Sequence, residues 1–387
     1  MSTHVKYSRD TIDEQNEITN HGDDLLDKKG QLVHRGWCRQ PLLKYNPDVL
    51  SRFRSAFRLK SWNYYAVGGP TFYFAVAAID LGYVTNFQTF IIEFDDANKD
   101  NKQQLCEEIT SPSLLKSLGL PRDSCQHGQH IAYSSSKFKL HFDVEGDSGN
   151  TDQQQKSVIH HIQVTSAKLG IVANLHFDLS PNRESVVLST PIGKDNFFYN
   201  RKTNLIPVTG SLQINGKEYL PQQQSNNDNN DKDIKDNKNN MAFGIMDWGR
   251  GVWDYNSFWI WSTSWGKAAD GRAIGLNLGS GFGDLSTHTE NAINVDGVIH
   301  KLGHIEFEYD DKDLMAPWRF VCKHGRFGEQ PLTFTPIKKK WEHNNFGLVM
   351  SSFHQIVGRV TGELLLDSGE RLAIDIHSFT EVHYARW

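Results

Sequence analysis

Short runs in which apolar and polar residues alternate, separated by turn dipeptides, constrain the fold of this chain more than any other feature. In HIEFEY, the apolar residues Ile305, Phe307 and Tyr309 fall at every second position, and RLAIDIH repeats this spacing from Arg371. A period of two indicates an extended strand with one buried face. In SLQINGKEYL, two such runs flank Asn215-Gly216, the strongest short signal for a hairpin.

Further turn dipeptides occur in the second half of the chain, at Asp270-Gly271, Asp296-Gly297 and Asp367 to Glu370. Many short strands at this spacing are typical of an antiparallel barrel or sandwich, not of a doubly wound parallel sheet. One helical pattern, PDVLSRFRSAFR at residues 47–58, interrupts them. We therefore predict an all-β fold of antiparallel barrel or sandwich units, with a few short helices.

A polar segment, PQQQSNNDNNDKDIKDNKNN at residues 221–240, breaks the strand patterns. Its only large apolar residue is Ile234, so it has too little apolar surface to offset the entropy lost on ordering. We predict a disordered insertion at the junction of two β units. The 387 residues suffice for two domains. We expect a flexible arm over 1–30, an N-terminal β domain over 31–220 and a C-terminal β domain over 241–387.

The composition argues against several classes of function. A net charge of −5 provides no basic face, so nucleic acid is not expected as a partner. No run approaches the roughly 18 apolar residues of a membrane helix, so no integral membrane segment is expected. The polar N-terminus has no signal-peptide pattern, and four scattered cysteines indicate reduced thiols in the cytoplasm.

The chain also lacks the common cofactor and metal motifs. It contains no HExxH and no CxxC spacing, and no amphipathic helix follows the glycine-rich GSGFG, so a dinucleotide fingerprint is not indicated. We expect no metal and no cofactor.

Five of the ten tryptophans lie within GIMDWGRGVWDYNSFWIWSTSWG, at residues 244–266. If a strand begins at Phe258, then Trp259, Trp261 and Trp265 share one face. One interpretation of this face is a packed aromatic core. The other is the wall of a ligand cavity, because buried indole N–H groups need partners and a core is more simply built from Leu, Ile and Phe. The residues alone leave both interpretations open.

A carboxyl group, Asp247, is set among these tryptophans. A carboxylate among indoles is costly unless it is paired, and Arg250 is the nearest cation along the chain. Asp247 is therefore either half of a structural Asp–Arg pair or a catalytic acid with a pKa raised by apolar surroundings. Farther on, GLNLG contains Asn277, and STHTENA contains Glu290 and Asn291. These polar groups either line the same cavity, with Glu290 as a second catalytic candidate, or cap strand ends.

Seven motifs occur in order along the chain: GWCRQPLLKYN, RLKSWNYYAV, MDWGRGVWDYNSFWIWSTSWG, IGLNLGSGFGD, HTENAINVDGVIHKL, APWRF and EVHYARW. From about Gly36 to Trp387 they closely resemble the family catalogued as domain of unknown function 2804. More remotely, the Asp-Trp-Gly motif and the aromatic strand after it resemble the calycin-like carotenoid hydratase and fungal pericyclase group. That resemblance implies two lipocalin-like units that hold apolar ligands, and it matches Asp247 to the acidic residue of the group.

Together these features predict a protein that binds a small apolar molecule, a lipid or an isoprenoid, in a tryptophan-lined cavity. The candidate ligand-binding residues are Trp248, Arg250, Trp253, Trp259, Trp261, Trp265, Asn277, Asn291 and Trp318. One alternative is a hydratase, isomerase or cyclase, in which Asp247 or Glu290 protonates an isoprenoid or polyene and indole faces stabilise the cation. Another is a carbohydrate-binding protein, which would present a flat, exposed aromatic platform instead of an enclosed pocket.

Overall fold

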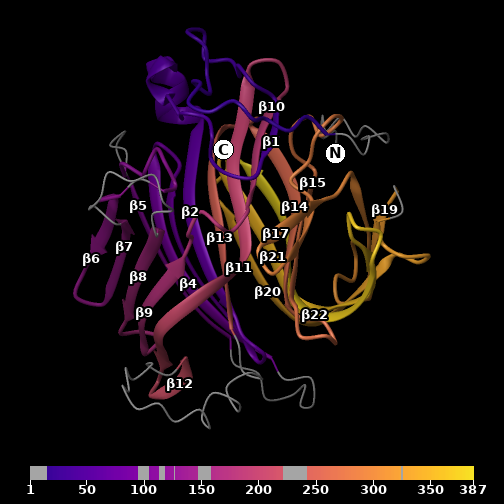
Figure 1. Cartoon of the computed structure of the whole chain (residues 1–387). Coiled ribbons are helices and arrows are strands. Elements are labelled where there is room, and N and C mark those ends of the chain that lie inside the picture. The colour runs from indigo at the N-terminus through magenta and orange to yellow at the C-terminus, as the bar shows by residue number, and fades with distance from the viewer. Residues whose placement is uncertain are drawn as a thin grey trace.

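Two antiparallel sheets, each curled into a half-barrel, lie next to each other in the computed structural model (Figure 1). The structure describes residues 15–94, 104–112, 118–125, 127–146, 158–220, 242–323 and 326–387. The prediction of an all-β fold with two lipocalin-like antiparallel units and few short helices is confirmed.

The first sheet contains 13 strands within the described residues. Its main path runs, from neighbour to neighbour, through β5 (Gln104–Pro112), β4 (Val84–Glu93), β3 (Phe72–Asp80), β2 (Leu59–Gly68), β13 (Phe243–Val252), β11 (Asn196–Ile214), β9 (Ile171–Asp178), β8 (Val158–Ser166), β7 (Phe138–Gly146) and β6 (His130–Ser134). Three further strands join it off this path: β1 (Gly36–Cys38), β10 (Val186–Ile192) and β12 (Lys217–Leu220).

The second sheet contains nine strands in the described part of the chain. Their order is β17 (Val298–Lys301), β16 (Ala292–Val295), β15 (Ala273–Ser280), β14 (Asn256–Lys267), β22 (Arg371–Arg386), β21 (Met350–Leu365), β20 (Leu332–Asn345), β19 (Trp318–Cys322) and β18 (Ile305–Glu308). The tryptophan-rich stretch therefore contributes one strand, β13, to the first sheet and the next, β14, to the second.

β11 is the long strand that connects the two arms of the first sheet. Its first part pairs with β10 and β13, and its second part, from Val208, pairs with β9 and β12. Between Thr203 and Ile206 the register with β13 shifts, and Leu205 has a φ of 56°. Such a bulge bends a strand and increases its twist, so a single strand can serve both arms of a curled sheet.

Buried apolar side chains form four clusters in the described residues, and alternation along β13 and β14 distributes the buried side chains of these two strands among three of them. Met246 and Trp248 of β13 point into the core of the first half-barrel. Ile260 of β14 points into the core of the second. Their sequence neighbours Ile245 and Trp261 point the other way and pack together in a layer between the two sheets. Because successive side chains of a strand face opposite sides, each of these strands contributes to two layers.

β13 belongs to the first sheet although it follows the polar segment 221–240 in the chain. It is hydrogen-bonded to β2 on one side and to β11 on the other, so the sheets divide the chain after Val252. Residues 221–240, predicted to be a disordered insertion, and residues 1–14 of the predicted arm lie outside the described residues. Within the rest of that arm, Leu25 and Leu26 are buried against the first half-barrel. The division into domains stays a proposal.

Two hairpin turns lie at dipeptides that the sequence predicted to form turns. Asn215 and Gly216 join β11 to β12 with φ values of 51° and 79°. Asp296 and Gly297 join β16 to β17 with φ values of 52° and 95°. Positive φ at both central residues is what a two-residue type I′ hairpin requires.

The helical pattern at residues 47–58 forms two single turns, η1 (Pro47–Val49) and η2 (Arg54–Arg58). β2 begins directly after η2 at Leu59, which pairs with Val252, so sheet pairing ends the helical turn. Within the described ranges, no helix has the length and apolar character needed to cross a membrane.

Candidate functional site

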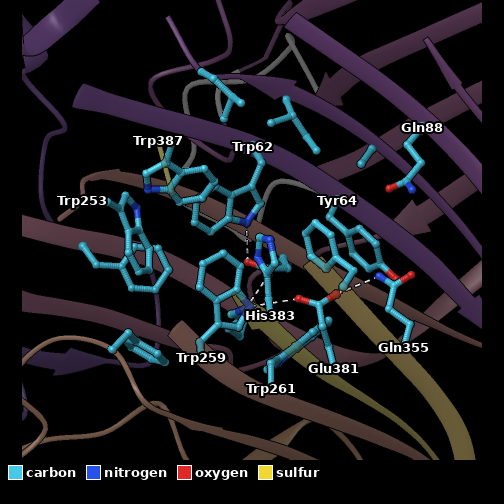
Figure 2. Close-up of a pocket in the computed structure, with 18 of the residues that line it drawn as sticks. Trp62, Tyr64, Gln88, Trp253, Trp259, Trp261, Gln355, Glu381, His383 and Trp387 are labelled. Carbon is cyan, nitrogen blue, oxygen red and sulfur yellow. Dashed lines mark hydrogen bonds and ion pairs between the residues drawn. The ribbon is translucent and has the colours of Figure 1, made fainter. Parts of the chain in front are cut away.

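A cavity lies between the two sheets, where β2, β3, β11 and β13 face β14, β21 and β22 (Figure 2). About 820 Å³ of it, including its opening, is free of protein atoms. Its apolar lining consists of Trp62, Tyr64, Ala77, Ile79, Leu81, Phe198, Trp253, Trp259, Trp261, Phe282, Phe353 and Trp387. Its polar lining consists of Gln88, Lys202, Asp247, Glu290, Gln355, Glu381 and His383. The cavity thus belongs to the layer between the half-barrels and not to the core of either.

Five tryptophans form much of the cavity wall (Figure 2). The ring centroid of Trp253 lies 6.0 Å from that of Trp62 and 5.3 Å from that of Trp259. Trp387 lies 5.9 Å from Trp259, and Trp261 extends the same strand face. Large rings lose little conformational entropy when they are ordered, and they cover much apolar area. The wall is consequently a broad and stiff apolar surface.

The indole N–H groups of this wall fall into two sets. Three donate to side chains of the protein: Trp62 to Asp247 at 3.0 Å, Trp259 to Glu381 at 2.9 Å and Trp261 to Asn277 at 2.9 Å. The N–H groups of Trp253 and Trp387 are buried and have no partner among the described residues. Buried donors are rarely left unpaired, so these two are the unused donors among the five indoles.

Asp247 forms an ion pair with Lys202, which stands directly opposite it in the pairing of β11 with β13. The Lys202 ammonium also lies 4.2 Å from the ring centroid of Trp261. Arg250 is three positions away from Asp247 on β13, and an odd spacing places two side chains on opposite faces of a strand. The cation that neutralises Asp247 is therefore Lys202 and not Arg250.

Glu381 of β22 is a second buried carboxyl group in the wall. One of its oxygens accepts a hydrogen bond from the N–H of Trp259, and the other accepts one from Nε2 of Gln355 at 2.8 Å (Figure 2). No cation of the described residues lies within ion-pair distance of it. Burial raises the pKa of Glu381, and the charge of Asp247 raises it further, against the opposing effect of these hydrogen bonds and of Lys202.

Glu290 is the third carboxyl group, and it reaches the cavity from the segment between β15 and β16. Asn200 donates to its Oε2, whereas its Oε1 is buried and has no partner in the described part of the chain. The Glu290 carboxyl group packs directly on β15 at Gly279. A Cβ atom added to Gly279 would lie only 2.1 Å from Oε1 of Glu290, so a larger residue would not fit there. Burial raises the pKa of Glu290, and the charge of Asp247 adds to the rise. Glu290 therefore keeps its proton to a higher pH than an exposed glutamate.

His383 of β22 stands among the rings of the cavity (Figure 2). Its ring centroid lies 3.4 Å from that of Phe353 and 4.1 Å from that of Trp259. Burial lowers the pKa of His383 well below its ordinary value, so the imidazole is neutral at physiological pH. Its Nε2 lies 3.0 Å from Ser351 Oγ, and its Nδ1 has no partner among the described residues.

Part of the residue set predicted from the sequence lines this cavity, namely Asp247, Trp253, Trp259, Trp261 and Glu290. Asn277 and Asn291 lie behind it. Asn277 accepts the Trp261 N–H and donates to the Glu290 carbonyl at 2.8 Å, and Asn291 donates to the Gly303 carbonyl at 2.9 Å. The two asparagines thus hold the segment that carries Glu290.

The other predicted ligand-binding residues lie elsewhere. Trp248 and Arg250 point into the first half-barrel, where the guanidinium lies 4.0 Å from the indole ring centroid. Trp265 is packed between the sheets and donates to the Gly69 carbonyl at 3.1 Å. Trp318 stands in the core of the second half-barrel. The structure does not bring these four to the cavity.

Sequence reasoning missed several residues that line the cavity: Trp62, Tyr64, Lys202, Gln355, Glu381, His383 and Trp387. A usable signal existed for some of them. In EVHYARW, the residues Glu381, His383 and Trp387 are separated by even intervals and share one strand face. Lys202 and Gln355 carry no such signal, because only strand pairing and packing bring them beside the carboxyl groups.

The chemistry available at this site comes from carboxyl, ammonium, imidazole and indole groups. Within the described ranges, no group of three or more His, Cys, Asp or Glu side chains is arranged to hold a metal ion. Two of the three carboxyls lack an ion-pair partner in the described chain. The site can therefore bind an apolar molecule, accept its polar atoms and expose it to a protonated carboxyl group.

Fold and site together define a lipocalin-like β protein with an aromatic cavity between two half-barrels. The chain belongs to the family described as domain of unknown function DUF2804, whose sequence profile matches residues 15–387. Its fold is similar to that of an AttH-like protein from Nitrosomonas europaea, with 10% identity, a TM-score of 0.43, and coverage of 84% of this chain and 92% of that chain. It is also similar to CghA in complex with Sch210972, with 14% identity, a TM-score of 0.46, and coverage of 94% and 97%. No curated protein matches the chain in sequence.

Proposed function

We propose that the protein binds a small apolar molecule, a lipid or isoprenoid, in the cavity between its two sheets. The observation that carries this proposal is the wall of five tryptophans around space not filled by protein atoms. An aromatic wall with a few oriented polar groups is the usual form of a small-molecule site. The unpartnered N–H groups of Trp253 and Trp387 support a ligand with one oxygen function at its end.

The burial of these rings favours an apolar ligand over a carbohydrate. Trp253 and Trp261 are only 3% and 4% exposed. Of the ten tryptophans, only Trp341 is well exposed, and it lies outside the cavity. Trp62, Trp259 and Trp387 are half-buried, so none of the five wall rings presents the fully exposed flat face that a sugar-binding platform requires.

The direct test is the binding of N-phenyl-1-naphthylamine, a neutral apolar fluorophore. We expect saturable binding, and we expect Trp253→Leu to weaken it by about tenfold or more, as the loss of an aromatic anchor does. Trp318→Leu is the matched control, because it removes a buried tryptophan from the second half-barrel core. Equal affinities in both variants, or no binding to the wild type, would contradict the proposal. Mass spectrometry of molecules that co-purify with the chain then identifies the natural ligand.

A second candidate function, protonation of an alkene, is favoured by Glu290. Its Oε1 is buried and unpaired, and its raised pKa lets it keep a proton to a higher pH than an exposed glutamate does. In this step the proton of Glu290 forms a new C–H bond with the electrons of the C=C bond, leaving a carbocation. Indole faces stabilise the cation. Loss of a different proton to the Glu290 carboxylate completes an isomerisation or cyclisation. Capture of water, followed by loss of a proton from the bound water to the same carboxylate, completes a hydration.

Deuterium incorporation tests this second candidate without knowledge of the product. The wild type is incubated in D₂O with farnesol, squalene and lycopene, and recovered and converted molecules are analysed by mass spectrometry. Incorporation that disappears in Glu290→Gln is the expected result. Glu329→Gln, a change at an exposed glutamate, is the control. If Glu290→Gln binds the fluorophore normally and incorporates deuterium as the wild type does, Glu290 is not the acid.

A further inference from the structure

A second cavity lies on the opposite face of the first sheet from the tryptophan-lined one. It is enclosed by the segment Pro41–Tyr45, the segment Arg122–Ser124 and the inner faces of β11 and β13. About 830 Å³ of it, including its opening, is free of protein atoms. Arg201 and Trp248 line it, whereas their sequence neighbours Lys202 and Asp247 line the first cavity. The same two strands therefore furnish two sites of different chemistry.

The guanidinium of Arg201 is the central polar group of this second cavity. The residue is 2% exposed. Its hydrogen bonds go to neutral acceptors: Ser185 Oγ at 3.1 Å, Ser124 Oγ at 3.2 Å, Cys125 Sγ at 2.8 Å and Gln40 Oε1 at 3.5 Å. Within the described residues, no carboxylate lies at ion-pair distance. A buried cation without a counter-ion is strongly disfavoured. A bound anion would compensate the charge of Arg201.

A second buried guanidinium, Arg250, increases the positive charge of the same half-barrel. It donates to the carbonyls of Trp62, Gly249 and Pro121 and to Asn63, and it too has no carboxylate at ion-pair distance in the described chain. Burial lowers its pKa to about 10, so it remains charged at neutral pH.

The other charged residues at this cavity leave the balance positive. Lys44 and Arg122 also line it, and Arg122 is paired with Asp48 at the surface. Asp123 is the one carboxylate among the described lining residues, and it accepts the backbone N–H of Cys125. A single carboxylate does not neutralise Arg201, Arg250 and Lys44 together.

One further donor at the cavity is unused. Trp248 Nε1 is buried and has no hydrogen-bond partner among the described residues. Trp248 lines the cavity together with Arg201 and is 2% exposed. An unpaired buried donor and an uncompensated guanidinium in the lining of one cavity are groups from which an oxyanion accepts hydrogen bonds.

We propose that this cavity binds a small oxyanion, a carboxylate or a phosphate, which pairs with Arg201 and accepts a hydrogen bond from Trp248. This site is independent of the apolar ligand, because the sheet itself separates the two cavities. Nη2 of Arg201, whose one hydrogen bond is the long one of 3.5 Å to Gln40, is the part of the guanidinium that has a hydrogen left to donate to either class of anion.

Thermal unfolding of the full chain tests the proposal with sodium phosphate and sodium acetate, each against sodium chloride at equal ionic strength. A ligand that binds only the folded state raises the melting temperature in a saturable manner. We expect such a rise with at least one of the two anions, and the larger rise assigns the class. No rise beyond that in chloride, with either anion, would overturn the proposal.

Three variants locate the site. Arg201→Gln should abolish the anion-dependent rise, and Trp248→Phe, which removes only one donor and little volume, should weaken the affinity by about tenfold. Arg272→Gln, at a surface arginine paired with Asp270 and Glu370, should leave the rise unchanged. If Arg201→Gln does not fold, Trp248→Phe carries the test. Unchanged anion affinity in Trp248→Phe would overturn the proposal, while binding of the neutral fluorophore reports separately on the first cavity.

Discussion

At the scale of single residues, only one of the three buried carboxyl groups of the cavity has a cation of the described residues at ion-pair distance. Lys202 forms an ion pair with Asp247, and it acts on Glu290 and Glu381 only at longer range. Two negative charges without close cations are unfavourable in a site lined by indoles. Glu290 and Glu381 therefore resist ionisation, and they supply the site with carboxyl groups that can hold a proton.

The free energy of unfolding depends on pH through Glu290. Burial raises its folded-state pKa above the ordinary 4.5, so the unfolded chain releases this proton at lower pH than the folded protein does. The stability that the protonated group contributes is present below about pH 4.5 and is lost as the pH rises through the folded-state pKa. In Glu290→Gln nothing ionises, so its free energy of unfolding should increase relative to the wild type as the pH rises above 4.5.

Chemical denaturation at a series of pH values measures this difference. Glu329→Gln, at an exposed position, should show no such trend relative to the wild type. A difference between wild type and Glu290→Gln that stays constant from pH 4.5 to neutrality would show that Glu290 ionises normally in the folded protein.

At the scale of elements, β13 is the strand that both cavities depend on. Asp247 and Gly249 face the tryptophan-lined cavity, and Trp248 and Arg250 face the interior of the first half-barrel. Gly249 lies under the indole of Trp62, where an added Cβ would be 2.2 Å from the ring. The absence of a side chain at this position lets the ring lie flat on the strand and fixes the shape of the cavity wall.

A pair of alanine substitutions on β13 tests this role. Gly249→Ala pushes Trp62 away from the strand, and Gly244→Ala brings a Cβ to 2.5 Å from Val208 on the other face. Both should lower the free energy of unfolding by about 1–3 kcal/mol, as overpacking does. Only Gly249→Ala should also change the affinity for N-phenyl-1-naphthylamine. Equal affinities in the two variants, measured where both are folded, would show that the position of Trp62 does not affect ligand binding.

At the scale of the whole molecule, the two parts of the chain on either side of residues 221–240 are joined through one sheet. β13 follows that segment, yet it lies between β2 and β11. Without β13, these two strands would lose their pairing on one side. The aromatic layer between the sheets adds contacts from both parts, such as the ring of Trp265 against Gly68.

Cleavage of the chain tests this continuity. A protease site introduced between residues 221 and 240 should allow a single cut, after which the two fragments should still elute together in gel filtration. β13 then remains hydrogen-bonded to the first fragment while its own chain continues into the second sheet. Elution as two separate species, without denaturant, would contradict the joined arrangement, and an uncut sample of the same variant is the control.

The sequence by itself determined the local structure of this protein. The period of two in runs such as HIEFEY and the dipeptides Asn215-Gly216 and Asp296-Gly297 predicted strands and hairpins, because side-chain alternation and positive φ are local properties. The same alternation predicted a shared face for Trp259 and Trp261. No strand was predicted around Asp247 and Arg250, so their position on opposite faces follows only from β13 in the structure.

Only the tertiary structure decided which residues the side chains on each strand face contact. Lys202 is 45 residues from Asp247 and pairs with it because β11 and β13 are neighbours in the sheet. Trp265 shares the strand face of Trp259 and Trp261, but it packs on Gly68 and lies outside the cavity. Which partner a residue finds depends on strand order and on the packing of one sheet against the other. These are long-range relations that no local pattern in the sequence specifies.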